Sequence, residues 1–248
     1  MILEIDWGNS RIKWRLQGES GTLAAGTEAE DNLDRLSEQV RGALPVGLVL
    51  DAVRVASVRP EGDEARLVQW AQAQWQVTPW FARAKARCDG VVSAYSHPER
   101  LGVDRWLALL AARQVAEEPV VIVQAGTALT ADLMDGRGAH LGGYIAPGWQ
   151  AMRRALNQGT ARVRSLQGPP DRLQLAPADN TERAVEAALS AMVVGFVENA
   201  CRQIEGSARL VVAGGDAGLI CSHFTWARLW PEIVLDGLAV AHRAEGVS

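Results

Sequence analysis

The chain has 248 residues, of which 48% are hydrophobic and 22% are charged, a composition that predicts one large domain or two smaller ones with a sizeable core. Its formal net charge of −4 offers no basic excess for a nucleic-acid backbone, its apolar runs fall short of a membrane-spanning helix, and its three scattered cysteines lack the CxxC spacing of a zinc site. We therefore expect a soluble, cytoplasmic protein that binds neither nucleic acid nor membrane.

The first part of the chain has strand and helix patterns in alternation. Ile2–Trp7 is a short apolar segment, and after a turn at 8–10 apolar and polar side chains alternate as far as Leu16. This pattern predicts a β-hairpin. The segments that follow have the patterns of a helix at 31–44, a strand at 49–58, a helix at 63–75 and a strand at 78–82.

The rest of the chain begins with a helix and then repeats the hairpin pattern. A turn at Gly126 and Thr127 separates two apolar strand candidates, as Gly8 and Asn9 do in the first hairpin. The expected elements are a helix at 104–115, strands at 119–123, 129–134 and 141–145, a helix at 181–204, a strand at 210–213 and a last helix at 234–242. Two matching hairpins half a chain apart indicate a duplication, with halves at 1–116 and 117–248.

The two hairpin turns have the chemistry of phosphate-binding loops. A turn of Gly with Asn, Ser or Thr leaves backbone N–H groups and hydroxyls at its tip, where they can hold phosphate oxygens. Asp6, just before the first turn, is placed to hold the Mg²⁺ that accompanies nucleotide phosphates. Together with Gly214 and Gly215 after a late strand, the two turns indicate ATP, whereas the first hairpin alone is also compatible with a tight turn that binds nothing.

Two further residues have both a chemical and a purely structural interpretation. Lys13, on the return strand, offers a mobile positive charge to a phosphate or is a solvated strand residue. Asp104 lies where a loop becomes a helix, so it either caps the helix or accepts the proton of a hydroxyl that attacks the γ-phosphate. Beside it, Gly102 lets a substrate approach and Arg105 offers a guanidinium to a carboxylate.

The order of these motifs resembles that of type III pantothenate kinases over nearly the whole chain. The specific combination is a GxDR box followed by GTAxTxD and then GGxIxPG. The matching residues are Asp6-Trp7-Gly8-Asn9-Ser10, Tyr95 with Pro98, Gly102-Val103-Asp104-Arg105, Gly126-Thr127-Ala128 with Thr130 and Asp132, Gly142-Gly143-Tyr144-Ile145-Ala146-Pro147-Gly148, Thr181 with Ala184 and Val185, and Gly214-Gly215-Asp216.

The resemblance implies an α/β protein with the duplicated ribonuclease H-like fold of the actin, Hsp70 and sugar kinase superfamily, working as a homodimer. The activity it implies is ATP-dependent phosphorylation of pantothenate to 4′-phosphopantothenate, the first step of coenzyme A biosynthesis. It also implies Mg²⁺ bound with the ATP and a monovalent cation, K⁺ or NH₄⁺.

The resemblance further implies a role for each matching site residue. Asp104 is the implied general base, and Asp6 is expected near the metal. The implied ATP-binding residues are Asp6, Gly8, Asn9, Ser10, Lys13, Gly126 and Thr127. The implied pantothenate-binding residues are Tyr95, Gly102, Val103, Asp104, Arg105 and Thr181, with Thr181 acting across the dimer.

Gln124 departs from the family pattern. Family members usually have an aspartate at this position, associated with the monovalent cation. Gln124 keeps an oxygen ligand without the charge, so we expect weaker cation binding. Because the family also contains Bvg accessory factor-like proteins linked to gene regulation, the alternative function is a catalytically weak or inactive regulatory protein. A different kinase or ATP-driven clamp of the superfamily would lack Tyr95 and the GxDR box.

Overall fold

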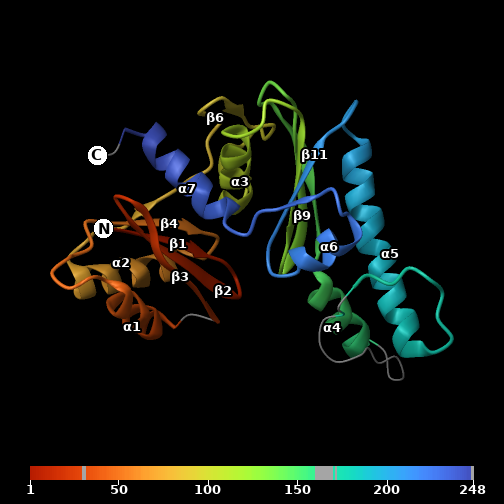
Figure 1. Cartoon of the computed structure of the whole chain (residues 1–248), viewed down its shortest axis with the longest axis horizontal. Helices are drawn as coiled ribbons and strands as arrows, with labels where there is room; N and C mark the ends of the chain where they lie inside the picture. The colour runs from red at the N-terminus through yellow and green to blue at the C-terminus, as the bar shows by residue number, and fades with distance from the viewer. Residues whose placement is uncertain (30–31, 160–169, 171, 247–248) are drawn as a thin grey trace. The chain divides into compact units, whose positions relative to one another are not determined.

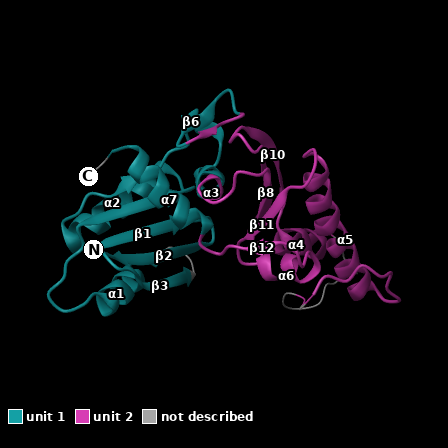
Figure 2. Ribbon diagram, turned by 45° about the horizontal axis from the view of Figure 1, so that its top comes forward, with its two compact units in different colours: residues 1–89, 95–111, 233–248 teal, residues 90–94, 112–232 magenta. Residues whose placement is uncertain are grey.

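The computed structural model describes residues 1–29, 32–159, 170 and 172–246, which fold into two compact α/β units (Figures 1 and 2). The first unit contains residues 1–89, 95–111 and 233–248, and the second contains 90–94 and 112–232. The expected division after residue 116 placed the last helix in the second half, whereas this helix, α7 (Ile233–Ala244), packs on strands of the first unit. The order of elements along a chain does not show to which sheet a helix returns.

The first unit is built on a five-stranded sheet with the order β3-β2-β1-β4-β5. Strands β1, β2 and β3 form an antiparallel meander, and β4 and β5 continue the sheet parallel to β1. The strands are β1 (Ile2–Trp7), β2 (Arg11–Gly18), β3 (Gly21–Ala29), β4 (Ala52–Ser57) and β5 (Trp80–Phe81), and a short β6 (Arg87–Cys88) follows. The predicted hairpin is confirmed. Strand β3 was not predicted, because its Gly, Ala and Thr residues carry little apolar alternation.

Helices lie on both faces of the first sheet. The helices are α1 (Leu33–Ala43), α2 (Glu61–Trp75), a 3₁₀ turn η1 (Pro98–Arg100), α3 (Val103–Arg113) and α7. On one face, the side chains of Leu3, Ile5 and Trp7 join a buried core with α1 and α2. The Oδ1 atom of Asn32 caps α1 by accepting the N–H of Arg35 at 3.0 Å, and the start predicted at residue 31 lies outside the described residues.

The second unit repeats the plan of the first sheet. Its sheet has the order β10-β9-β8-β11-β12, with β8, β9 and β10 antiparallel and β11 and β12 parallel to β8. Its elements are β7 (Val91–Val92), β8 (Val120–Ala125), β9 (Ala128–Met134), β10 (His140–Pro147), α4 (Trp149–Gly159), α5 (Thr181–Arg202), β11 (Arg209–Ala213), α6 (Ala217–His223) and β12 (Arg228–Leu229). The same strand order and directions in both units confirm the duplication that the hairpins indicated.

Helix α5 combines a core face with an exposed apolar face. Among the described helices it is the one long and apolar enough to span a membrane, with a mean hydropathy of 1.4 and 44% of its apolar stretch buried. Val185, Leu189, Val193 and Val197 lie in the core of the second unit. These contacts are those of a core helix of a folded domain.

Candidate functional site

The strand alternation of β1 places Asp6 at the end of the first sheet. Ile5 and Trp7 point into the apolar core, so Asp6 and Glu4 lie on the opposite face. Immediately after β1 the chain turns tightly, and the N–H of Gly8 donates to the carbonyl of Arg11 at 3.0 Å. A carboxylate therefore stands beside the hairpin turn, as the sequence predicted.

Three charged side chains of the first unit share this site. Burial raises the pKa of Asp6 to about 6, the positive charge of Lys13 lowers it and the negative charge of Asp104 raises it further. Lys13 lies directly opposite Asp6 in the β1–β2 ladder and is half-buried. The contribution of Lys13 to the Asp6 pKa favours a role in the site over that of a solvated strand residue.

The geometry of Gly102 sets the position of the Asp104 carboxylate. The carbonyl of Gly102 accepts the N–H of Trp106 at 3.0 Å, so Gly102 holds the capping position and Asp104 lies inside the first turn of α3. There the Oδ1 atom of Asp104 accepts the N–H of Arg105 at 2.9 Å. A Cβ atom on Gly102 would lie 2.7 Å from this Oδ1, closer than non-bonded atoms pack. Asp104 thus bonds within the first turn without occupying the capping position, and glycine at 102 leaves room for its carboxylate.

Arg105 and Tyr95 form a second polar pair in the same unit. The Arg105 side chain is buried, and its Nη1 donates to the Tyr95 hydroxyl at 3.1 Å. The guanidinium carbon also lies 5.9 Å from the centre of the Tyr95 ring. Val103, between Gly102 and Asp104, is 7% exposed, so its side chain is not accessible to a ligand. The structure thus brings Asp6, Lys13, Tyr95 and the GxDR box together in one unit.

The second hairpin turn is enclosed by two glycines from other loops. The N–H of Gly126 donates to the carbonyl of Ala128 at 2.9 Å, and Thr127 is exposed at the tip. A Cβ atom on Gly148 would lie 1.9 Å from the Gly126 carbonyl oxygen. A Cβ atom on Gly214, whose φ is +98°, would lie 2.1 Å from the Ala125 carbonyl oxygen. Only glycine at these two positions lets three loops meet at the tip.

Gln124 has a neighbouring oxygen that could complete a cation site. It lies on β8 directly opposite Thr130 of β9, on the sheet face that also carries Asp132. Thr130 is 8% exposed, and its Oγ1 atom has no hydrogen-bond partner among the described residues. Asp132 pairs with the Nε2 atom of His140 at 3.0 Å. The neutral oxygens of Gln124 and Thr130 fit a weakly bound monovalent cation.

Thr181 lies in the second unit, at the start of helix α5. It is exposed at the first residue of α5, whose cap is the Asn180 Oδ1 atom that accepts the N–H of Arg183 at 3.0 Å. Together with Gly126, Thr127 and Gln124 it belongs to the second unit.

A cleft of about 730 Å³ opens beside the first hairpin turn, on the side of α1 and α2. Trp7, Trp70, Arg59 and Arg66 are among its lining residues. Arg59 follows β4 and its Nη1 atom donates to the carbonyl of Asn9 at 3.2 Å. The sequence analysis did not identify Arg59. A signal for it was available, because Arg59 follows β4 and the carboxyl ends of the parallel strands β1 and β4 meet at one edge of the sheet.

The acidic groups of the first unit fit a divalent cation that is bound mainly through phosphate. The described residues contain no cluster of three or more His, Cys, Asp or Glu side chains that could hold a metal by themselves. Mg²⁺ takes one or two carboxylates and keeps phosphate and water ligands. Asp6, whose raised pKa reflects a poorly solvated carboxylate close to Asp104, is a group that could serve as such a ligand.

Comparison with known proteins gives a consistent result over the chain. The model of the type III pantothenate kinase family matches residues 2–203. The type III pantothenate kinase of Cellvibrio japonicus is 37% identical over 97% of this chain and 96% of that protein. The one of Pseudomonas aeruginosa strain PAO1 is 38% identical over 97% of this chain and 98% of that protein.

Solved structures establish the fold at lower identity. A putative Baf family transcriptional activator from Campylobacter jejuni has a TM-score of 0.65 at 19% identity and covers 98% of both chains. A putative 2-dehydro-3-deoxygalactonokinase from Sinorhizobium meliloti has a TM-score of 0.62 at 15% identity, with 99% of both chains covered. A putative N-acetylmannosamine kinase from Listeria monocytogenes, also covering 99% of both chains, reaches 0.54 at 13% identity. The fold is the duplicated ribonuclease H-like fold of the actin, Hsp70 and sugar kinase superfamily.

We predict that Asp6→Asn makes the protein more stable at neutral pH. A folded-state pKa of about 6 against the ordinary 3.8 means that the wild type loses stability as the pH rises from 3.8 through 6. The neutral variant does not undergo this loss, so its free energy of unfolding should exceed that of the wild type at pH 8 by about 2 kcal/mol more than at pH 4. Urea unfolding at both pH values measures this difference. A gap that does not grow with pH contradicts the assignment of a raised pKa to Asp6.

Proposed function

The chain belongs to the type III pantothenate kinase family, and we propose that it transfers the γ-phosphoryl group of ATP to pantothenate, the first step of coenzyme A biosynthesis. The observation that carries the mechanism is the pairing of Asp6 and Asp104 in one unit, beside a hairpin turn and Lys13. The fold is shared with proteins described as kinases, and the names of the relatives given above indicate pantothenate as the acceptor of the phosphoryl group.

Asp104 acts as the general base in this proposal. Its carboxylate accepts the proton of the pantothenate hydroxyl while the hydroxyl oxygen bonds to the γ-phosphorus. The bond between that phosphorus and the bridging oxygen of the β-phosphate breaks, and ADP leaves with the electron pair. Because phosphoryl transfer needs little covalent help, the main task of the carboxylate is to orient the hydroxyl. Gly102 serves this task by leaving space for the carboxylate.

The first hairpin holds the phosphates of ATP. The backbone N–H groups of Asn9 and Ser10 and the Ser10 hydroxyl face the phosphate oxygens, Gly8 shapes the turn through its N–H bond to the Arg11 carbonyl, and Lys13 adds a positive charge. Asp6 would hold Mg²⁺, which neutralises charge on the β- and γ-phosphates. In the second unit the turn of Gly126 and Thr127 binds phosphate through the N–H and hydroxyl of Thr127, since the Gly126 N–H bonds to the Ala128 carbonyl, and Gln124 with Thr130 would hold a monovalent cation, K⁺ or NH₄⁺.

Arg105 and Tyr95 are placed to recognise pantothenate. The buried Arg105 guanidinium, which donates to the Tyr95 hydroxyl at 3.1 Å, presents its N–H groups in a planar fork that suits the carboxylate of the acceptor. Gly102 and Val103 offer backbone next to the base. We assign Thr181 to the same substrate, contributed by the second subunit of a dimer, since it is exposed and stands in the other unit.

An exposed apolar surface on the second unit fits a homodimer. Strand β10 is an edge strand that leaves Ile145 67% exposed and Tyr144 38% exposed. The Tyr144 ring packs on Phe196 of α5 with the ring centres 6.2 Å apart. One turn before Phe196, Met192 is 57% exposed. An uncovered sheet edge next to an apolar helix face is the kind of surface that a second copy buries.

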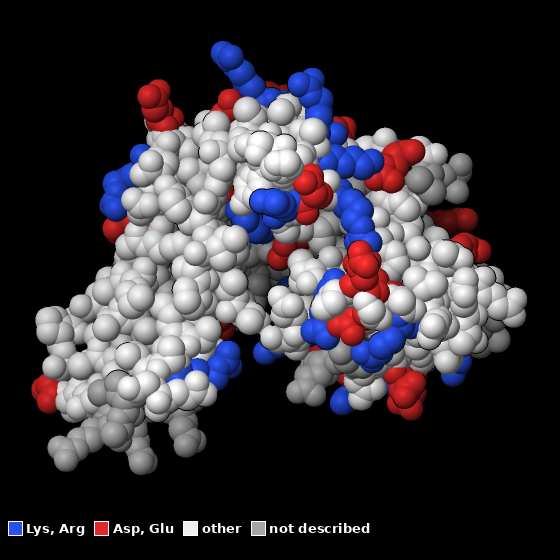
Figure 3. Space-filling view, turned by 180° about the vertical axis from the view of Figure 1, so that it is seen from behind, with Lys and Arg blue, Asp and Glu red and all other residues white. Residues whose placement is uncertain are grey.

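No specific observation favours a regulatory protein without turnover. The Campylobacter jejuni structure described as a transcriptional activator is too distant to carry more than the fold. On the face seen in Figure 3, acidic and basic side chains are intermixed, which together with the net charge of −4 speaks against a nucleic-acid surface. We place the protein in the cytoplasm, where ATP is available to it.

The proposed function is tested by ADP release from MgATP with and without pantothenate, at zero and high K⁺ or NH₄⁺. We expect release that depends on pantothenate and rises with the cation. Formation of 4′-phosphopantothenate, followed by mass spectrometry, distinguishes transfer from simple ATP hydrolysis. A folded protein that releases no ADP under any of these conditions refutes the kinase.

We predict that Asp104→Asn lowers kcat by at least about a hundredfold, because the positioned base is lost while the fold is kept. Binding of ATP, measured by calorimetry, should stay within about threefold of the wild type. The control Glu38→Gln neutralises an exposed carboxylate on α1 and should leave kcat unchanged. Near wild-type turnover of Asp104→Asn rules out the general-base assignment.

We predict that the protein sediments as a dimer of its 26.7 kDa chain and that Met192→Glu shifts it toward the monomer. A charge placed in the apolar surface must be desolvated in the dimer, which weakens association. Glu38→Lys, a charge change on the first unit, is the control that should remain dimeric. A monomeric wild type at micromolar concentration contradicts the dimer and with it the assignment of Thr181 to the partner site.

A further inference from the structure

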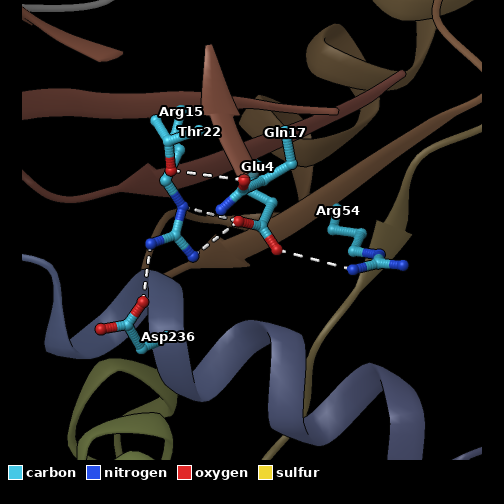
Figure 4. A network of polar contacts seen from close by, with 6 residues as sticks. All are labelled: Glu4, Arg15, Gln17, Thr22, Arg54 and Asp236. Atoms are coloured by element: carbon cyan, nitrogen blue, oxygen red, sulfur yellow. Dashed lines mark hydrogen bonds and ion pairs between the residues drawn. The ribbon is translucent and has the colours of Figure 1, made fainter. Parts of the chain in front are cut away.

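A largely buried ion network joins Glu4, Arg15, Arg54 and Asp236 in the first unit (Figure 4). Glu4 is two residues before Asp6 on β1, so both side chains lie on the same face of the sheet. Arg15 of β2 stands directly opposite Glu4 of β1, and its Nε and Nη2 atoms contact the Glu4 Oε2 atom at 2.8 Å and 2.7 Å. The Nη1 atom of Arg15 donates to the Oδ1 atom of Asp236 at 2.6 Å. Arg54 of β4 lies 3.5 Å from the other Glu4 oxygen. One guanidinium therefore joins two strands to helix α7.

Helix α7 is in turn in direct contact with the helix that carries Asp104. A Cβ atom on Gly237, the residue after Asp236, would lie 1.9 Å from the carbonyl oxygen of Leu107 in α3. Such an approach of two helix backbones is possible only at glycine, and it fixes the distance between the helices at this point. A displacement of α7 is thus transmitted to α3.

The network and the candidate site use residue pairs of the same β1–β2 ladder that lie two positions apart. Asp6 faces Lys13 on one rung, and Glu4 faces Arg15 two residues further from the turn. All four side chains point to the face on which Asp236 meets Arg15, because residues two apart share one face of a strand. Arg15 is therefore connected to Asp6 through Glu4 and strand β1, and to Asp104 through Asp236 and helices α7 and α3.

We propose that Arg15 and Asp236 are positioning residues for phosphoryl transfer, which hold α7 and α3 so that the Asp104 carboxylate stays in place against Asp6. This inference rests on the proposed kinase function. Neither residue touches a substrate in it, and both act through the backbone contact between Gly237 and Leu107.

The chemistry of the network suits positioning better than stability. Glu4 and Arg15 are 1% and 4% exposed, so their mutual attraction is largely offset by the cost of removing both charges from water. What such a pair adds is a defined geometry. A guanidinium presents donors in a fixed fork and can bridge two carboxylates, whereas a lysine ammonium is a point charge on a flexible stem. Asp236 is the exposed end of the network, with 37% of its side chain accessible.

The first test is Asp236→Ala, which removes the link to α7 and leaves the buried pair of Glu4 and Arg15 intact. We expect kcat to fall about tenfold, with KM for ATP and pantothenate within about twofold of the wild type. Asp236→Glu keeps the carboxylate and should recover most of the loss. The control Glu64→Ala removes a peripheral ion pair with Arg83, which is 55% exposed, and should change neither constant.

The second test is a double-mutant cycle with Arg15→Met. If Asp236 acts through Arg15, the variant with both changes should turn over as fast as Arg15→Met alone. Additive losses of kcat contradict the link, and so does Asp236→Ala with wild-type kcat. A loss confined to KM, or one that Asp236→Glu does not recover, also overturns the inference. Should Arg15→Met fail to fold, the Asp236 variants still decide.

The activity of the wild type distinguishes a failure of this inference from a failure of the proposed kinase function on which it rests. A wild type without pantothenate-dependent ADP release overturns the kinase and the positioning role with it. An active wild type beside a fully active Asp236→Ala overturns the positioning role alone.

Discussion

The buried carboxylate of Asp6 is the constraint around which the first unit is arranged. It lies on the sheet face opposite the apolar core with α1 and α2, close to the carboxylate of Asp104. The Asp6 side chain loses solvation and faces the charge of Asp104, and both effects raise its pKa. Such a carboxylate is kept only if the surrounding structure compensates for it. Lys13, placed opposite by the register of the hairpin, supplies part of that compensation. A divalent cation with nucleotide phosphate is suited to supply the rest, which connects the electrostatics of the unit to its chemistry.

The duplication places the same hairpin in two different chemical environments. Both units carry the same strand order and the same tight hairpin turn at the end of the first strand. In the first unit the carboxylate of Asp6 precedes the turn, so its buried charge needs positive groups nearby. In the second unit Gln124 takes the equivalent place, and the crowding comes from backbone: Gly148 and Gly214 each approach the tip more closely than a side chain would allow. The same hairpin therefore supports a charged site in one unit and a neutral one in the other.

The C-terminal helix gives the first unit a second connection between its strands and α3, the helix that carries Asp104. Chain order assigns α7 to the later half, but its contacts are with β1, β4 and the backbone of α3. By returning to the first sheet it covers the face on which Glu4 and Asp6 lie. The helix that closes this face is thereby also the one that carries Asp236 to Arg15.

The sequence by itself determined the local features: the hairpin that places Asp6 before its turn, the repeat of that hairpin and the family motifs around Asp104. These depend on side-chain alternation and turn residues, which act over a few positions. It did not reveal β3, whose small residues carry no strong pattern, or the unit to which α7 belongs. Nor did it reveal the partnership of Arg15 with Asp236, which lie at opposite ends of the chain. Such contacts depend on which surfaces meet once the sheets have formed, and only the tertiary structure decides that.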